Sequence, residues 1–175
     1  MFLYVLMAVY AGLGWAFNAR LGSMMATAIS TTGAVFTFIS LVTGSLWGKP
    51  AWGVYWVWDA RMTSTLILMF LYIGFISLQA SIDDPRRADR AGAVLALVGL
   101  INVPIIYFSV QWWNTLHQGA TFTARSFKMA PSMLSAMLIL LAACWMYSIA
   151  VVLARVRCII REREGEAPWL AEAVA

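Results

Sequence analysis

The sequence has 175 residues, of which 62% are hydrophobic and 11% charged, and its mean hydropathy is +0.79. A soluble domain carries about 45–50% apolar and about 25% charged residues, so this composition excludes a soluble enzyme, a disordered chain and a nucleic-acid-binding module. Cys144 and Cys158 form no CxxC or Cys/His spacing, which argues against a zinc site or a disulfide framework. We therefore expect an integral membrane protein.

Five uncharged runs follow one another along the chain, at residues 1–19, 21–48, 62–82, 91–124 and 129–154. A bilayer core of roughly 30 Å needs about 20 apolar residues as a helix, so each run can span it. We predict helices near residues 1–17, 25–46, 63–81, 92–109 and 130–153, with a kink in the fourth at Asn102 and Pro104. The fold class is then all-α, a polytopic membrane helix bundle with five transmembrane helices.

The basic residues are divided unevenly between the two sides of this bundle. One side holds eight of the twelve: Arg20, Arg86, Arg87, Arg90, Arg155, Arg157, Arg161 and Arg163. The other side holds Lys49, Arg61, Arg125 and Lys128. The positive-inside rule places the eight in the cytoplasm. We expect one transmembrane domain at residues 1–154, with outer-face loops at 47–62 and 109–128, and a cytoplasmic tail at 155–175.

The first outer loop is dense in tryptophan. Trp52, Trp56 and Asp59 recur at i, i+4 and i+7, so a helix through this stretch would place them on one face, with Trp58 nearby. An interfacial aromatic belt would explain any single tryptophan here, but four within residues 47–58 exceed what a belt needs. A flat aromatic surface with charges at its rim suits a large planar ligand that carries carboxylates.

His117 is the only histidine, and it follows Trp112 and Trp113 in the second outer loop, with Trp113 at the i+4 spacing. A neutral imidazole beside aromatic faces is a candidate axial ligand for heme iron. A single histidine in a loop is as readily a solvated or hydrogen-bonded residue. The spacing alone leaves both interpretations open.

Three segments narrow the interpretation: residues 44–50 (GSLWGKP), 52–64 (WGVYWVWDARMTS) and 109–119 (SVQWWNTLHQG). In this order and topology they resemble the C component of the bacterial cytochrome c maturation system, the heme exporter protein C family, whose members carry a tryptophan-rich "WWD" signature. The resemblance covers residues 33–121 and, more loosely, all five predicted spans.

The resemblance implies a heme-delivery protein of the bacterial cytoplasmic (inner) membrane, not an enzyme. Family members bind heme b at the outer face and present it to a periplasmic heme chaperone, the E component. The ATP-driven A and B components and a small D component are the other partners. Carried over by residue, Trp52, Trp56, Trp58 and Asp59 form the heme platform, and His117 is one axial ligand of the iron.

Other side chains near the outer face complete the expected site. Trp112 and Trp113 would add aromatic surface. Heme propionates need cationic partners near a low-dielectric boundary, so we expect one or two pairs with Arg61, Arg125, Lys128 or Lys49. For Arg61, which is favoured by its place beside Asp59, a salt bridge with that carboxylate is the alternative.

The sequence departs from the family pattern in its number of spans and histidines. Family members have six spans and a second axial histidine in the outer loop after the first. We therefore expect a further span and that histidine upstream of Met1. The alternative is a five-span protein in which His117 alone binds five-coordinate heme, or in which a partner chain supplies the second ligand.

Two other functions stay open. A permease that moves heme or another solute is poorly supported, because the spans are nearly free of ionisable residues. A cytochrome b-like electron-transfer subunit normally needs paired histidines inside the spans, and this sequence has none there.

Overall fold

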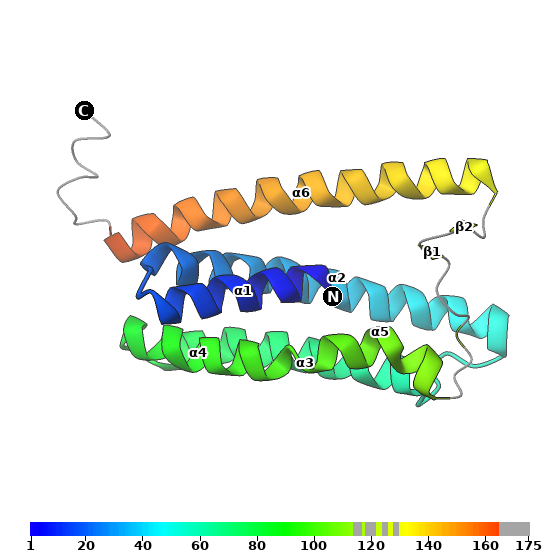
Figure 1. Ribbon diagram of the computed structural model, residues 1–175, viewed down its shortest axis with the longest axis horizontal. Coiled ribbons are helices and arrows are strands. Elements are labelled where there is room, and N and C mark those ends of the chain that lie inside the picture. Colours follow the sequence, from blue (N-terminus) through cyan, green and yellow to red (C-terminus); the bar gives the residue numbers. More distant parts are fainter. Residues whose placement is uncertain (114–116, 118–121, 124–125, 128–129, 165–175) are drawn as a thin grey trace.

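The computed structural model describes residues 1–113, 117, 122–123, 126–127 and 130–164 (Figure 1). These residues form six helices and a minimal antiparallel strand pair. The helices are α1 (Phe2–Ala16), α2 (Arg20–Trp52), α3 (Ala60–Ser81), α4 (Pro85–Gly99), α5 (Asn102–Trp112) and α6 (Pro131–Glu164), and the strands are β1 (Phe122–Thr123) and β2 (Ser126–Phe127). Helices α4 and α5 follow each other along one axis and correspond to the fourth predicted helix. The predicted all-α membrane helix bundle is confirmed.

Four segments of the described residues are long and apolar enough to cross a membrane: α2, α3, α4 with α5, and α6. Helix α1 is equally apolar but has only 15 residues. At 1.5 Å per residue it measures about 22 Å, which is less than a bilayer core of roughly 30 Å. Four of the five predicted spans are therefore found as segments long enough to cross, and the first is found as a shorter apolar helix. Helices α2 and α6 run well beyond the predicted bounds, and α6 continues without a break through residues 155–164.

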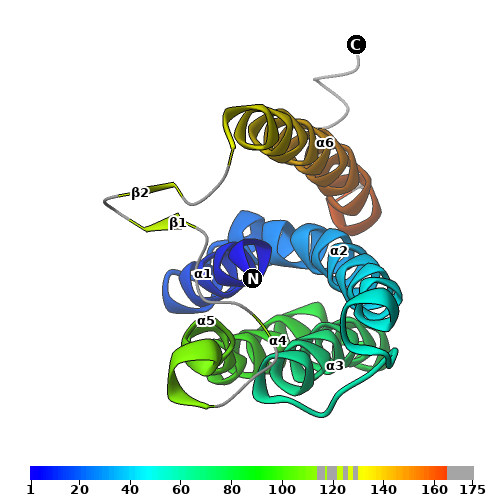
Figure 2. The same ribbon diagram turned by 90° about the vertical axis from the view of Figure 1, so that its right-hand side faces the viewer.

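The helices form three layers (Figure 2). Helix α6 lies on one side, α1 and α2 lie in the middle, and α3, α4 and α5 lie on the far side. Helices α1 and α2 approach each other closely at Gly14 and Gly22, where a Cβ added to Gly22 would lie 2.9 Å from the Gly14 nitrogen. Glycine at this crossing lets the two backbones meet, as is common between membrane helices.

The interruption between α4 and α5 falls at Leu100 and Ile101. Pro104 has no N–H to donate to the Leu100 carbonyl, which accepts instead from the Val103 nitrogen at 3.1 Å. The Asn102 amide donates to the Ser64 carbonyl of α3 at 2.8 Å. The break predicted from Asn102 and Pro104 is thus confirmed, and the polar side chain beside it is satisfied by a neighbouring helix.

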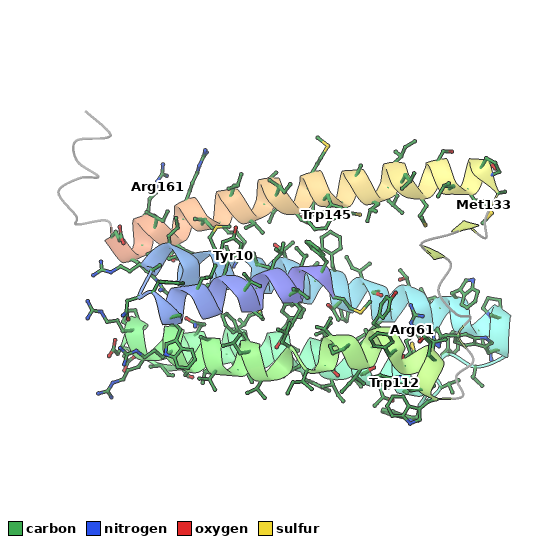
Figure 3. The ribbon with its side chains drawn as sticks, viewed as in Figure 1. Tyr10, Arg61, Trp112, Met133, Trp145 and Arg161 are labelled. Atoms are coloured by element: carbon green, nitrogen blue, oxygen red, sulfur yellow. The ribbon has the colours of Figure 1, made fainter. Side chains whose placement is uncertain are left out.

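The two ends of the bundle differ in chemistry. The start of α2, the turn between α3 and α4, and the end of α6 lie at one end, where Arg161 is found (Figure 3). The end of α2, the start of α3, the end of α5 and the start of α6 lie at the other, where Arg61 and Trp112 are found. The two aromatic loops therefore share one end, as the alternation of spans predicts.

Candidate functional site

The first aromatic loop begins where α2 ends, at Trp52. Gly53 adopts φ 81° and ψ −6°, the left-handed region in which a residue without Cβ is unstrained, and its nitrogen donates to the Lys49 carbonyl at 2.9 Å. Residues 53–59 are not helical. The expectation that a helix places Trp52, Trp56 and Asp59 on one face is therefore wrong, because the chain turns away immediately after Trp52.

Asp59 begins α3. Its Oδ1 accepts a hydrogen bond of 2.7 Å from the Met62 nitrogen, the usual contact of a helix N-cap. The Asp59 side chain is 5% exposed, so it lies beneath the surface. A buried carboxylate needs partners for both of its oxygens.

The second partner of Asp59 is His117. Nδ1 of the imidazole lies 2.7 Å from Asp59 Oδ2, across 58 residues of sequence. The His117 side chain is 19% exposed, and its ring meets Trp52 edge to face at 4.8 Å between centroids. The end of α2, the start of α3 and the second aromatic loop therefore converge on one histidine.

The tryptophans of the first loop form two pairs. Trp52 contacts Trp47 edge to face at 5.3 Å, beside His117. Trp56 contacts Trp58 at 5.5 Å, and Trp58 is 74% exposed. Within the described part of the chain, the buried indole nitrogen of Trp56 has no hydrogen-bond partner.

Trp112 and Trp113 lie at the end of α5. Trp112 stacks on Phe108 at 5.1 Å between centroids, and Trp113 contacts Trp112 at 5.9 Å. Both rings are more than half exposed. Helix α5 ends at Trp112, so the i+4 relation of Trp113 to His117 does not place the two side chains on a helical face. Among the described residues, Trp52 at the end of α2 contacts the imidazole.

Two of the four cations that we expect at the outer face, Arg61 and Lys49, lie in the described residues. Arg61 lines a pocket of about 310 Å³ between α1, α2, α3 and α6, with Tyr72 and Trp145 among its walls. No salt bridge joins Arg61 to Asp59 in the described residues. Lys49 donates to the Gly53 carbonyl at 3.1 Å and lies over the Tyr55 ring. Arg125 and Lys128 lie outside the described residues.

Comparison with known proteins identifies the family. Residues 1–171 match the sequence profile of heme exporter protein C. The chain belongs to this family. It is 45% identical over 172 residues to heme exporter protein C of Escherichia coli K12, covering 98% of this chain and 69% of that protein. It is 40% identical over 172 residues to the Haemophilus influenzae protein of the same name, covering 95% and 68% of the two chains.

A third relative matches a shorter part of the chain at higher identity. Heme exporter protein C of Bradyrhizobium diazoefficiens is 60% identical over 101 residues, which are 58% of this chain and 38% of that protein. The resemblance drawn from the three tryptophan- and histidine-containing segments is thereby confirmed at the level of the family.

The two roles of Asp59 are what the sequence reasoning missed in this member of the heme exporter protein C family. An aspartate directly before an apolar run is a helix N-cap signal, and Asp59 precedes the run at 62–82. This signal would have placed Asp59 at the start of α3 and its carboxylate against the helix. The contact with His117 has no local signal, because it depends on how two distant loops meet.

Proposed function

We propose that this chain binds heme b at the outer face of the cytoplasmic membrane and delivers it to a periplasmic heme chaperone during the biogenesis of c-type cytochromes. The hydrogen bond between His117 Nδ1 and Asp59 Oδ2 carries the proposal. It joins the tryptophan-rich loop to the one histidine of the chain, in a family whose members are named heme exporter protein C. The proposed role is positioning, not catalysis.

The buried carboxylate gives His117 the properties of a metal ligand. A carboxylate that accepts from Nδ1–H holds the tautomer in which Nε2 carries the lone pair and fixes the orientation of the ring. The edge of Trp52 against the ring restricts its rotation. When bound, heme supplies an iron that accepts an imidazole nitrogen and a conjugated ring that is later attached covalently. His117 and Asp59 therefore fit this group.

The aromatic side chains fit the porphyrin. Trp58 exposes most of its surface beside Trp56, and an indole face removes a large apolar area from water when a planar ligand covers it. The indole N–H of Trp56 is a buried donor without a partner in the described residues, and a donor of this kind is stabilised by an acceptor on a bound molecule. We propose Trp52, Trp56, Trp58, Trp112 and Trp113 as the aromatic surface of the site.

The cations of the outer face would pair with the propionates. Arg61 is the best placed of the described cations, because it lies at the start of α3, two residues after Asp59, and is not paired with that carboxylate. Lys49 already donates to the end of α2. Arg125 and Lys128, beside the His117 segment in sequence, complete the proposed set.

Orientation and partners follow from the charge distribution. Eight arginines lie at the end of the bundle opposite His117, which supports an outer-face histidine and a cytoplasmic C-terminus in the inner membrane. We propose the E component as the acceptor of heme and the A, B and D components as the associated complex.

An optical titration tests the proposal. The purified chain is mixed with heme, and reduced-minus-oxidised spectra are recorded for wild type, His117→Gly and the Trp52→Ala/Trp56→Ala/Trp58→Ala variant. We expect a heme spectrum that His117→Gly alters and that added imidazole partly restores. The triple variant is expected to retain less heme, because stacking area is lost. An unchanged spectrum in His117→Gly would refute the assignment of this ligand.

A further inference from the structure

A second pocket lies at the opposite end of the bundle from His117. It encloses about 190 Å³ between the end of α1, the start of α2 and the first turns of α4. Its polar walls come from Asn18, Arg20, Ser23, Arg86, Asp89 and Arg90, and Trp15 forms an apolar wall. Three guanidinium groups therefore border a pocket that the proposed heme site does not use.

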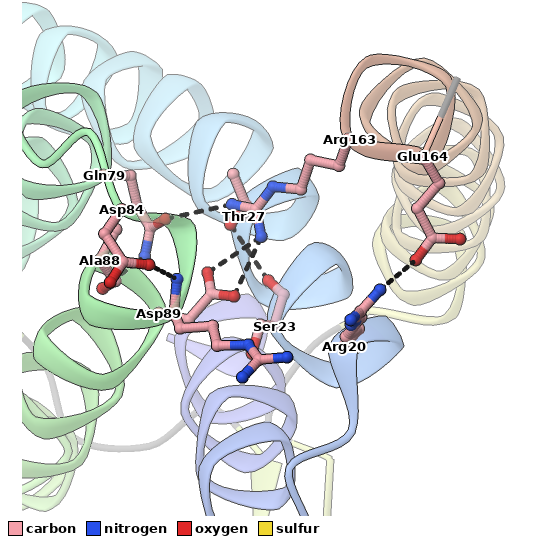
Figure 4. Close-up of polar contacts among 10 residues, drawn as sticks. Arg20, Ser23, Thr27, Gln79, Asp84, Ala88, Asp89, Arg163 and Glu164 are labelled. Carbon is pink, nitrogen blue, oxygen red and sulfur yellow. Dashed lines mark hydrogen bonds and ion pairs between the residues drawn. The ribbon is translucent and has the colours of Figure 1, made fainter. Parts of the chain in front are cut away.

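The one carboxylate in this pocket is already neutralised. Asp89 accepts two hydrogen bonds from Arg163 of α6, at 3.0 and 3.1 Å, and the same guanidinium reaches Gln79 of α3 at 3.4 Å (Figure 4). We call Arg163, Asp89 and Gln79 the arginine clamp. Because Arg163 neutralises Asp89, the remaining charge around the pocket is the positive charge of its three arginines.

Those arginines are poorly paired. Arg20 lies 3.8 Å from Glu164, with the arginine side chain 68% exposed, which is a weak surface pair. In the described part of the chain, neither Arg86 nor Arg90 has an ion pair with an acidic side chain. Two uncompensated cations on the same face of a helix, four residues apart, repel each other and favour an anion between them.

The start of α2 adds donors to the same pocket. Ala19 precedes the helix and supplies no side-chain cap, so this long helix brings its positive dipole end to the pocket, where the Gly22 nitrogen already donates to the Ala19 carbonyl at 3.0 Å. Ser23, in the first turn of α2, is 8% exposed and lines the pocket, and its hydroxyl donates to no acceptor in the described residues. This hydroxyl is therefore available to donate to a ligand in the pocket.

We propose that this pocket binds a phosphate-bearing anion, either the headgroup of an anionic phospholipid or a soluble phosphate. Phosphate oxygens suit arginine forks, a helix N-terminus and a serine hydroxyl together. Basic pockets between membrane helices bind anionic headgroups in this way. Trp15 is half exposed at the pocket wall, as tryptophans at a membrane interface are.

The two sources are distinguished by binding measurements on the full chain in detergent. Native mass spectrometry compares retention of dioleoylphosphatidylglycerol with that of dioleoylphosphatidylcholine, and isothermal titration follows sn-glycerol 3-phosphate. The test variant is Arg86→Gln/Arg90→Gln. The control is Arg155→Gln/Arg157→Gln, which removes the same charge from exposed positions near the same end of the bundle but outside the pocket. Ser23→Ala is a third variant that changes no charge.

We expect phosphatidylglycerol to be retained in preference to phosphatidylcholine. Each cation is expected to contribute roughly fivefold, so phosphatidylglycerol retention should fall on the order of 25-fold in Arg86→Gln/Arg90→Gln. Retention should stay unchanged in the control. Ser23→Ala should also weaken binding. If glycerol 3-phosphate binds and its binding is lost in Arg86→Gln/Arg90→Gln, the site is supported and a phosphate group is sufficient for binding. If only phosphatidylglycerol binding is lost in that variant, the site is supported as a lipid headgroup site. Equal loss in test and control variants, or no loss in either, overturns the proposal.

Discussion

Asp59 offers the sharpest test of the histidine assignment, because its two carboxylate oxygens have separate partners. Oδ1 accepts from the Met62 nitrogen at 2.7 Å and Oδ2 contacts His117 Nδ1 at 2.7 Å. In Asp59→Asn, the amide oxygen can keep the contact with Met62. The amide nitrogen then donates to Nδ1, so the imidazole proton must move to Nε2. The substitution reverses the tautomer while leaving the helix cap in place.

The magnitudes follow from these contacts. Aspartate and asparagine are about equal as N-caps, so Asp59→Asn should keep α3 and cost about 1 kcal/mol at most, from the loss of charge assistance. A partner that orients a metal-ligating histidine is typically worth about 10–100-fold in affinity. We therefore expect heme affinity to fall about 10–100-fold in Asp59→Asn. Asp59→Ala should add the loss of the cap, about 1 kcal/mol of stability.

The assay has two readouts. Heme binding is followed by absorbance, and nitrogen-15 NMR of the heme-free protein reports which imidazole nitrogen of His117 carries the proton. The matched control is Asp84→Ala, since Asp84 caps α4 through the Arg86 nitrogen at 2.9 Å and does not contact a histidine. The Asp84→Ala variant should lose stability and keep the wild-type heme affinity. Wild-type heme affinity in Asp59→Asn despite a reversed tautomer would refute the reasoning, as would equal losses of affinity in Asp59→Ala and Asp84→Ala.

The remaining predictions concern the frame that holds the site. A Cβ at Gly99 would overlap the Tyr4 hydroxyl, so Gly99→Ala should lower the thermal unfolding temperature of the bundle. Adding Tyr4→Phe should restore part of that loss. Equal unfolding temperatures of the single and double variants would contradict this contact. Asp89→Ala leaves Arg163 without its carboxylate and should cost about 1–3 kcal/mol, with protease cleavage at the end of α6 as the readout and Arg157→Ala as the control. Gly53→Ala forces a side chain into a left-handed conformation at about 1 kcal/mol and should weaken heme binding, whereas Gly44→Ala, in open space, should not.

The fold could be predicted because apolar length and charge position decide it. The uncharged runs predicted the position of each helix, with α4 and α5 counted as one. Asn102 and Pro104 predicted the break between α4 and α5. Helix ends were less accurate. Helix α2 continues through Trp52 and α6 through Glu164, because aromatic and charged residues at a membrane boundary remain compatible with a helix once the span has begun.

The site could be predicted in composition but not in geometry. The sequence placed the tryptophans and His117 at one end, and the contact of Asp59 with His117 agrees with that. The helical spacing failed at Gly53, whose left-handed backbone ends α2 and turns the chain before Trp56. No local pattern could have paired His117 with Trp52 and Asp59, because that pairing depends on the packing of two loops more than fifty residues apart.

Among the described residues, helix α6 is buried against the bundle only in its C-terminal half. Its buried residues are Ser148, Val152 and Val156, all in its C-terminal half, and the arginine clamp binds that end to α3 and α4. The helix diverges from the bundle toward Pro131 (Figure 1). Trp145, near the middle of α6, still contacts Phe2 at 4.5 Å between ring centroids, so the segment that contains no buried residue runs from Pro131 to Trp145 and is about 21 Å long. A change in the tilt of this segment would therefore lose little packing, whereas a displacement at the arginine clamp would uncover Val152 and Val156.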